Sequence, residues 1–152
     1  MVGILIVTHG ELGLQFINTA RLIGLESEEG VAALSIDPTQ SPDIIRQQLA
    51  DSIDRVRKKN GVLILTDLFG GTPANISLSF LEDGKVDVVT GINLPMIIKA
   101  INSRSDHDLN TLAKLVTEAG KENIYRASET LKHRQKRKAG GVTPSRPGYD
   151  AG

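Results

Sequence analysis

Four short apolar runs constrain the fold of this chain more than any other feature of its sequence. Val2–Val7 is a continuous run of aliphatic and β-branched residues, and comparable runs follow at Val31–Ile36, Val62–Thr66 and Val86–Val89. Such runs are typical of strands that are buried on both faces of a sheet. We therefore predict four interior strands over these ranges.

Segments with helical spacing of apolar residues separate and follow these strands. The predicted helices lie near residues 12–23, 42–59, 72–81, 93–98 and 109–120, and Gly120 is interpreted as the stop of the last one. The clearest start is Ser41-Pro42-Asp43, with an N-cap, a proline at the first helical position and an acid in the first turn. Strands alternating with helices predict an α/β fold: a doubly wound, mainly parallel sheet of four strands with helices on both faces.

The C-terminal part of the chain differs in character. We assign residues 1–131 to one domain and residues 132–152 to a basic and then Gly/Pro-rich tail, which lacks an apolar period and is predicted to be disordered. Ile124–Leu131 fits either a last strand or a helical extension. The basic cluster is either a docking arm for an acidic partner or RNA, or a solvated terminus, and the second interpretation is favoured.

Composition excludes several classes of protein. The 152 residues include no cysteine, so disulfides, thiolate metal sites and a cysteine nucleophile are excluded. Lys+Arg and Asp+Glu are 18 each, which gives no basic surplus of the kind that nucleic-acid binding requires. The apolar start of the chain lacks the basic region of a signal peptide, and no run is long enough for a membrane helix. These features agree with a cytoplasmic location.

His9 is the first candidate for chemistry, because functional groups in such sheets gather beyond the carboxyl ends of the strands. It follows the first predicted strand by two positions and precedes Gly10, which allows close approach of a ligand. A histidine ring nitrogen can accept a phosphoryl group and pass it on. Taken alone, a histidine in this place is more often an ordinary surface residue.

Asp67 directly follows the third predicted strand. If the first and third strands are neighbours, its carboxylate reaches the His9 ring, fixes the tautomer and leaves the other ring nitrogen free to attack. The alternative is that Asp67 only closes the turn that follows it, which is a common use of aspartate.

Gly70, Gly71 and Thr72 lie between Asp67 and a predicted helix start at Pro73. Two glycines, a hydroxyl and a helix N-terminus together suit an anion pocket for one phosphoryl group. An ordinary turn with Thr72 as N-cap explains the same residues. Neither nucleotide-binding glycine motif is present. Three roles are open for Phe69: it could cover the site, dock a protein partner or be buried under the loop.

Three segments at matching places, Val7–Gly10, Thr66–Asn75 and Gly91–Met96, resemble one known family. This family is the mannose-family enzyme IIA of the bacterial phosphoenolpyruvate-dependent sugar phosphotransferase system. The resemblance covers roughly residues 2–131, and the three motifs together are much more specific than any one of them.

The resemblance implies a phosphocarrier. The protein HPr would pass a phosphoryl group to His9, and a IIB protein would receive it and phosphorylate the incoming sugar. Asp67 would hold the His9 ring, while Thr72 and nearby backbone N–H groups would bind the phosphoryl oxygens. The family is dimeric with an exchanged C-terminal strand, for which Ile124–Leu131 is the candidate. No metal or organic cofactor is implied, and the membrane is reached only through IIC and IID partners.

Other functions remain open at this point. The basic segment stands where a linker to a IIB domain would begin, so we expect the acceptor to be a separate chain. A regulatory phosphocarrier, which signals its phosphorylation state without transporting sugar, is the main alternative. A relative that serves dihydroxyacetone kinase ranks lower, and a small-molecule hydrolase ranks lowest, because no serine or cysteine nucleophile motif is present.

Overall fold

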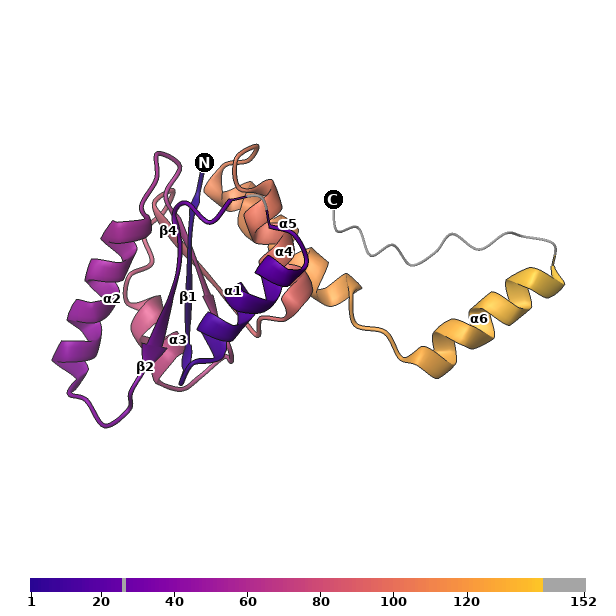
Figure 1. Ribbon diagram of the computed structural model, residues 1–152, viewed down its shortest axis with the longest axis horizontal. Helices are drawn as coiled ribbons and strands as arrows, with labels where there is room; N and C mark the ends of the chain where they lie inside the picture. The colour runs from indigo at the N-terminus through magenta and orange to yellow at the C-terminus, as the bar shows by residue number, and fades with distance from the viewer. Residues whose placement is uncertain (26, 141–152) are drawn as a thin grey trace.

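A computed structural model describes residues 1–25 and 27–140 of the chain (Figure 1). In chain order, its elements are β1 (Gly3–His9), α1 (Leu12–Leu22), β2 (Val31–Ile36), α2 (Pro42–Val56), β3 (Val62–Thr66), α3 (Thr72–Leu78), β4 (Val86–Thr90), α4 (Leu94–Ser103), α5 (Leu109–Glu122) and α6 (Ala127–Ala139). The predicted α/β class and the four strands are confirmed.

The four strands form one parallel sheet in the order β2-β1-β3-β4. From β1 the chain moves to β2 on one side and then returns to β3 on the other side of β1. The strand order therefore reverses between β1 and β3, which is where parallel α/β sheets place their functional sites. The condition that β1 and β3 must be neighbours is met, with Val7 paired to Thr66.

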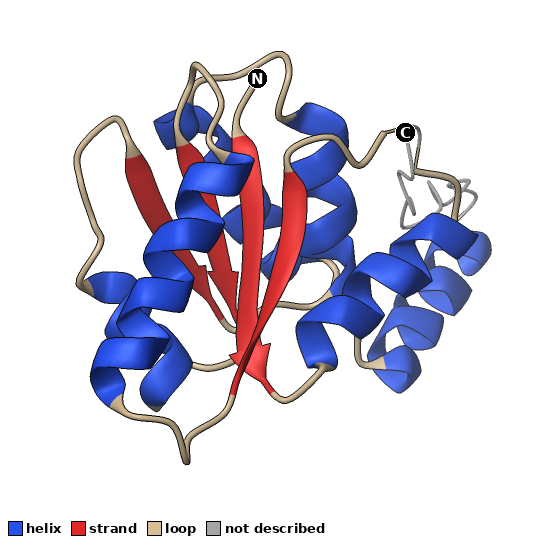
Figure 2. Ribbon diagram, turned by 60° about the vertical axis from the view of Figure 1, so that its left-hand side comes forward, coloured by secondary structure: helices blue, strands red, loops and turns tan. Residues whose placement is uncertain are grey.

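Helices cover both faces of the sheet, as predicted (Figure 2). Residues of α1, α4 and α5 pack on one face against alternate side chains of β1 and β3, including Ile4, Ile6, Leu63 and Leu65. Residues of α2 pack on the other face with Leu5, Val7, Val62 and Ile64, and Ile76 of α3 joins them. The continuous apolar runs thus reflect strands with two buried faces, and the burial holds the carboxyl ends of β1 and β3 rigidly in place.

The helix starts follow from local chemistry. Ser41 caps α2 by accepting a hydrogen bond from the N–H of Ile44, and Pro42 is its first residue, as predicted. Asn93 and Asp108 cap α4 and α5 in the same way, accepting from Met96 and Thr111. Each cap satisfies an N–H group that the helix itself leaves free.

Four predicted helix ends are wrong. α2 ends at Val56, before the predicted end at residue 59, and α4 continues to Ser103, beyond the predicted end at residue 98. α3 ends at Leu78, three residues before the predicted end at Leu81. α5 continues through Gly120 to Glu122, so Gly120 does not stop the helix. Gly120 is buried, and a Cβ there would lie 2.5 Å from the Met96 sulfur. This glycine serves close packing between α5 and α4.

The C-terminal segment also departs from expectation. Residues 127–139 form α6, so the disorder predicted from Lys132 is wrong over 132–139, and the helical alternative holds for 127–131. Residues 1–25 and 27–140 contain no fifth strand. α6 has no buried residue and extends away from the sheet (Figure 1). The rest of the predicted tail, 141–152, lies outside the described residues, and strand exchange in a dimer stays a prediction.

None of the helices in the described ranges is both long and apolar enough to cross a membrane.

Candidate active site

The structure brings His9 and Asp67 into direct contact at the carboxyl edge of the sheet. Because Val7 pairs with Thr66, Asp67 lies beside the end of β1. Its Oδ2 accepts a hydrogen bond from the His9 main-chain N–H at 2.9 Å and lies 2.8 Å from His9 Nδ1. One carboxylate oxygen therefore holds both the backbone and the ring of His9.

The Asp67 side chain is 8% exposed, whereas the His9 side chain is 46% exposed. Burial favours the neutral form of Asp67, but hydrogen bonds from the His9 N–H, the His9 ring and the Leu68 N–H outweigh it and hold the pKa of Asp67 below its usual value. Asp67 is thus an ionised hydrogen-bond acceptor at neutral pH.

An ionised carboxylate can only accept, so the short contact requires a proton on His9 Nδ1. In a neutral ring the other nitrogen, Nε2, then carries the lone pair. This arrangement produces a nucleophile at Nε2 with a negative charge placed to stabilise the imidazolium that forms on attack.

Gly71 lies against the reactive side of the ring. A Cβ at this position would be 3.3 Å from His9 Cε1 and 3.4 Å from Nε2. Its φ of +83° also belongs to the left-handed region that favours glycine. Gly70 has a φ of +87°, but a Cβ there would meet nothing within 4 Å. The two predicted glycines therefore differ: both shape the turn, and only Gly71 also keeps space beside Nε2.

Several other polar, aromatic and proline residues of the three motif segments lie in the loop after β3 and at the starts of α3 and α4. Thr72 is half-buried at the first position of α3, and Asn75 is exposed, with its N–H bonded to the Gly71 carbonyl. Phe69 is 79% exposed, so the expectation of burial under the loop is wrong. Asn93 caps α4. Pro95 is half-buried near the start of α4.

Sequence reasoning assigned no role to Thr8, which lies between the apolar run and His9. Its side chain is fully buried and hydrogen-bonds to the start of α1. A threonine near the end of a strand carries no distinctive sequence pattern, so only its contacts in the structure reveal this role. Within residues 1–25 and 27–140, no group of three or more His, Cys, Asp or Glu side chains is placed to hold a metal ion.

Comparison with known families identifies the family of this chain. Residues 3–117 match the family model EIIA-man, described as the fructose IIA component of the phosphotransferase system. The chain belongs to this family. The match contains His9, Asp67 and the glycine loop, and it confirms the resemblance to mannose-type enzyme IIA proteins.

Two bacterial relatives of this chain are also components of the phosphotransferase system. The mannose-specific EIIAB component of Escherichia coli K12 is 27% identical over 125 residues, which make up 81% of this chain and 38% of that protein. The fructose-specific EIIA component of Bacillus subtilis is 25% identical over 132 residues, or 86% of this chain and 90% of that one. The chain thus spans well under half of the E. coli relative and nearly all of the B. subtilis relative.

Solved structures agree as well. The EIIA component of Streptococcus agalactiae superposes with a TM-score of 0.75 at 29% identity, covering 85% of this chain and 99% of that one. The mannose/sorbose-specific IIA subunit of Enterococcus faecalis superposes with a TM-score of 0.71 at 24% identity, covering 82% and 93% of the two chains. The second comparison supports the fold.

Proposed function

We propose that this protein is a phosphocarrier of the phosphotransferase system, in which His9 accepts a phosphoryl group from HPr and passes it to a IIB protein during sugar uptake. The observation that carries the proposal is the 2.8 Å contact of His9 Nδ1 with Asp67 Oδ2, which leaves Nε2 as the free nucleophile. Membership of the EIIA-man family supports the same chemistry.

In the transfer step, the Nε2 lone pair attacks the phosphorus of the phosphorylated donor. The new N–P bond forms as the donor's bond to phosphorus breaks, and the electron pair of that bond returns to the donor. The proton on Nδ1 stays in place, so the phosphorylated ring is cationic and the ionised Asp67 stabilises it. Transfer to the acceptor is the reverse of this step, and positioning and electrostatics supply most of the catalysis.

Gly70, Gly71 and Thr72 are the proposed phosphoryl-binding residues. Gly71 supports this role most directly, because its missing Cβ keeps space open beside Nε2, where the phosphoryl group would attach. The Thr72 hydroxyl follows directly in the chain and is half-buried at the start of α3. Nitrogen–phosphorus transfer of this kind needs no metal or organic cofactor.

The partners follow from this assignment. HPr is the donor, the acceptor is a IIB protein, and the work takes place in the cytoplasm, with the membrane reached through the IIC and IID proteins. We also expect a homodimer. The alternative within the same chemistry is a regulatory phosphocarrier whose two forms engage different partners, and it uses the same His9 step.

The deciding experiment is phosphorylation from phosphoenolpyruvate. We would incubate the protein with phosphoenolpyruvate, enzyme I and a cognate HPr, and measure intact mass for wild type, His9→Ala and His107→Ala. His107 lies between α4 and α5 and serves as the control histidine. The proposal requires one acid-labile phosphoryl group on wild type and on His107→Ala, and none on His9→Ala. An unmodified wild type, or a modified His9→Ala variant, would contradict it.

A second step separates transport from regulation. Phosphorylated protein is mixed with the IIB protein encoded in the same genome, and loss of the label from His9 is followed with time. Transfer to IIB supports sugar uptake. Retention of the label on His9 would favour the regulatory alternative.

A further inference from the structure

We propose that Thr8 is a positioning residue for His9 and that its hydroxyl fixes the nucleophile's backbone to helix α1. This inference rests on the proposed phosphocarrier function and adds a residue to its machinery. The Thr8 hydroxyl hydrogen-bonds to Gly10 and Gly13, not to the His9 ring or Asp67, and it acts through the backbone around His9.

The Thr8 side chain lies at the end of β1 with no exposed surface. Its Oγ accepts a hydrogen bond from the Gly13 N–H at 2.8 Å, and its hydroxyl lies 3.4 Å from the Gly10 carbonyl oxygen, to which it donates. Both partners lie beyond His9 in the chain. The hydroxyl therefore bridges the turn that directly follows His9.

This bridge also replaces a missing helix cap. The N-cap residue of α1, Glu11, makes no side-chain hydrogen bond to the helix. Gly13 is the second residue of α1, and its N–H is one of the groups that a helix cannot satisfy internally. Thr8 satisfies this N–H from the preceding strand, so the start of α1 is joined to the end of β1.

Gly13 makes this contact possible. It is buried, and a Cβ there would lie 3.1 Å from the Ile6 Cγ2 and 3.3 Å from the Thr8 Oγ. These distances are shorter than ordinary van der Waals contacts, so glycine favours the close approach of α1 to β1. A side chain at this position would require its neighbours, including the Thr8 hydroxyl, to shift by a few tenths of an ångström.

The peptide between Thr8 and His9 connects this bridge to the chemistry. Its N–H donates to Asp67 Oδ2 at 2.9 Å, and the same oxygen lies 2.8 Å from Nδ1. A tilt of that peptide therefore moves the ring relative to the carboxylate. His9 is held by β3 on one side and by α1 on the other, and Thr8 supplies the second restraint.

Thr66 shows that this role is not general for buried threonines at strand ends. It ends β3 directly before Asp67 and is also fully buried. Its hydroxyl donates to the Leu68 carbonyl oxygen at 3.5 Å, and within residues 1–25 and 27–140 it makes no hydrogen bond to a helix. Thr8 differs because its acceptor function joins two elements of the fold.

The test compares Thr8→Val, Thr8→Ser and Asp108→Ala. Valine keeps the shape of threonine without the hydroxyl, and serine keeps the hydroxyl. Asp108→Ala removes a helix-cap bond of the same length, 2.8 Å to the Thr111 N–H at the start of α5, away from the site. The measured quantities are the kcat and KM for phosphoryl transfer from HPr, the thermal midpoint, and the proton occupancy of His9 Nδ1 from ¹⁵N NMR.

Thr8→Val is expected to lower kcat about tenfold with KM unchanged, because displacement of a nucleophile by a fraction of an ångström slows the step without weakening the docking of the donor. Thr8→Ser should recover most of the rate. Asp108→Ala should lower the thermal midpoint comparably and leave kcat at the wild-type value. If Thr8→Val proves too unstable to assay, Gly13→Ala, which crowds the hydroxyl, should show the same kcat defect.

A wild-type kcat in Thr8→Val, or a rate in Thr8→Ser as low as that of valine, would overturn the proposal. Failure of the phosphocarrier function itself gives a different result. In that case wild type takes up no phosphoryl group and no kcat can be measured. The proton occupancy of His9 Nδ1 can still be measured by NMR, because that measurement needs no phosphoryl donor. Reduced Nδ1 proton occupancy in Thr8→Val would still support the positioning role, and unchanged occupancy would refute it.

Discussion

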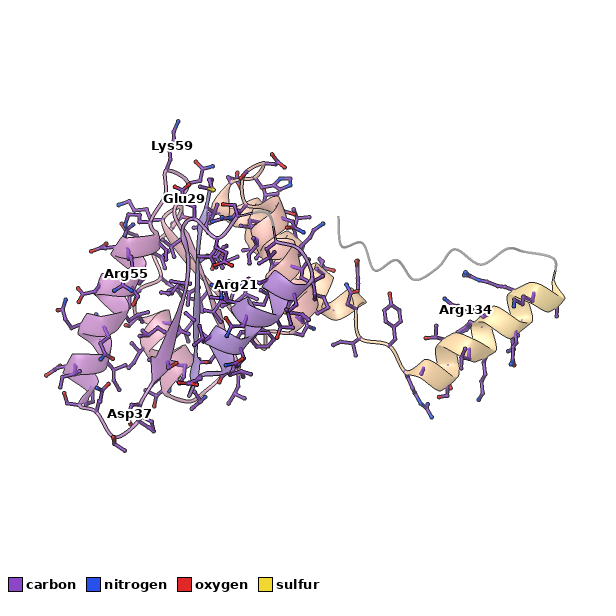
Figure 3. All side chains as sticks on the ribbon, in the orientation of Figure 1. Arg21, Glu29, Asp37, Arg55, Lys59 and Arg134 are labelled. Carbon is purple, nitrogen blue, oxygen red and sulfur yellow. The ribbon has the colours of Figure 1, made fainter. Side chains whose placement is uncertain are left out.

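Two aspartates directly follow the two strands that flank β1, and their surroundings differ. Asp67 follows β3, is almost fully buried, and accepts hydrogen bonds from the backbone and the ring of His9. Asp37 follows β2, is exposed, and accepts hydrogen bonds from the N–H and hydroxyl of Thr39 in its own turn. Figure 3 shows Asp37 in the loop between β2 and α2, at the end of the molecule opposite Lys59 and Glu29.

Register explains the difference. β2 pairs Ile36 with His9, so Asp37 lies one position past the histidine along the sheet. β3 pairs Thr66 with Val7, so Asp67 falls just short of the histidine and its side chain reaches back to it. The two carboxylates have the same chemistry and equivalent places in the topology. An offset of two residues in strand pairing therefore decides which of them becomes part of the site.

The largest expected effect comes from exchanging each carboxylate for an amide. Asp67→Asn should slow phosphoryl transfer to His9 on the order of a hundredfold, because the amide cannot stabilise the cationic ring and does not enforce the same tautomer. Asp37→Asn should change the rate by less than about twofold, since its bonds stay within its own turn. Rapid-quench kinetics with phosphorylated HPr measures both, and equal losses would refute the role of register.

A smaller effect is expected at the glycine beside the ring. Gly71→Ala places a methyl group 3.4 Å from His9 Nε2 at a φ of +83°, and should lower the transfer rate about tenfold by crowding the nucleophile. Gly84→Ala is the matched control, because Gly84 has a φ of +69° and a Cβ there would meet nothing within 4 Å. Both variants should lose about 1 kcal/mol of stability from backbone strain. A rate loss in Gly84→Ala equal to that of Gly71→Ala would show that strain alone is responsible.

The smallest expected effect is on how the free energy of unfolding depends on pH. Hydrogen bonds from His9 and Leu68 outweigh burial and hold the pKa of folded Asp67 below its unfolded value near 3.8. The ionised carboxylate therefore stabilises the fold above that value, and this stabilisation is lost as pH falls through the folded pKa. The difference in unfolding free energy between wild type and Asp67→Asn should narrow between pH 7 and pH 2, as measured by urea titration.

Asp37 provides the comparison for this effect too. Its pKa is also lowered, chiefly by the Thr39 hydroxyl, but its carboxylate is exposed to solvent. Solvent screening weakens such bonds. The difference in unfolding free energy between wild type and Asp37→Asn should therefore narrow less between pH 7 and pH 2 than the difference for Asp67→Asn. A larger pH effect at Asp37 than at Asp67 would contradict the difference in burial and bonding described above.

The sequence was sufficient to predict that His9 and Asp67 lie together, because both residues follow strands that are recognisable as continuous apolar runs. The apolar runs at Val2–Val7 and Val62–Thr66 have no competing interpretation, and the residues that follow them must lie at one edge of a parallel sheet. The pairing of His9 with Asp67 then required only that β1 and β3 be adjacent.

Other features depend on packing and could not be predicted. Gly70 and Gly71 are equivalent in sequence, and only the position of the His9 ring separates them. Gly120 has the composition of a helix stop, but the close approach of Met96 explains its presence inside α5. α6 has no buried face, so its sequence lacks the helical spacing of apolar residues from which the other helices were predicted.

The most direct test of the central claim is to identify which nitrogen of His9 carries phosphorus. We would phosphorylate ¹⁵N-histidine-labelled protein with phosphoenolpyruvate, enzyme I and HPr, and measure phosphorus–nitrogen couplings by NMR. Because Asp67 occupies Nδ1, the coupling is expected at Nε2, with the Nδ1 proton retained. Phosphorus on Nδ1 would mean that the contact with Asp67 breaks during transfer, and would contradict the account.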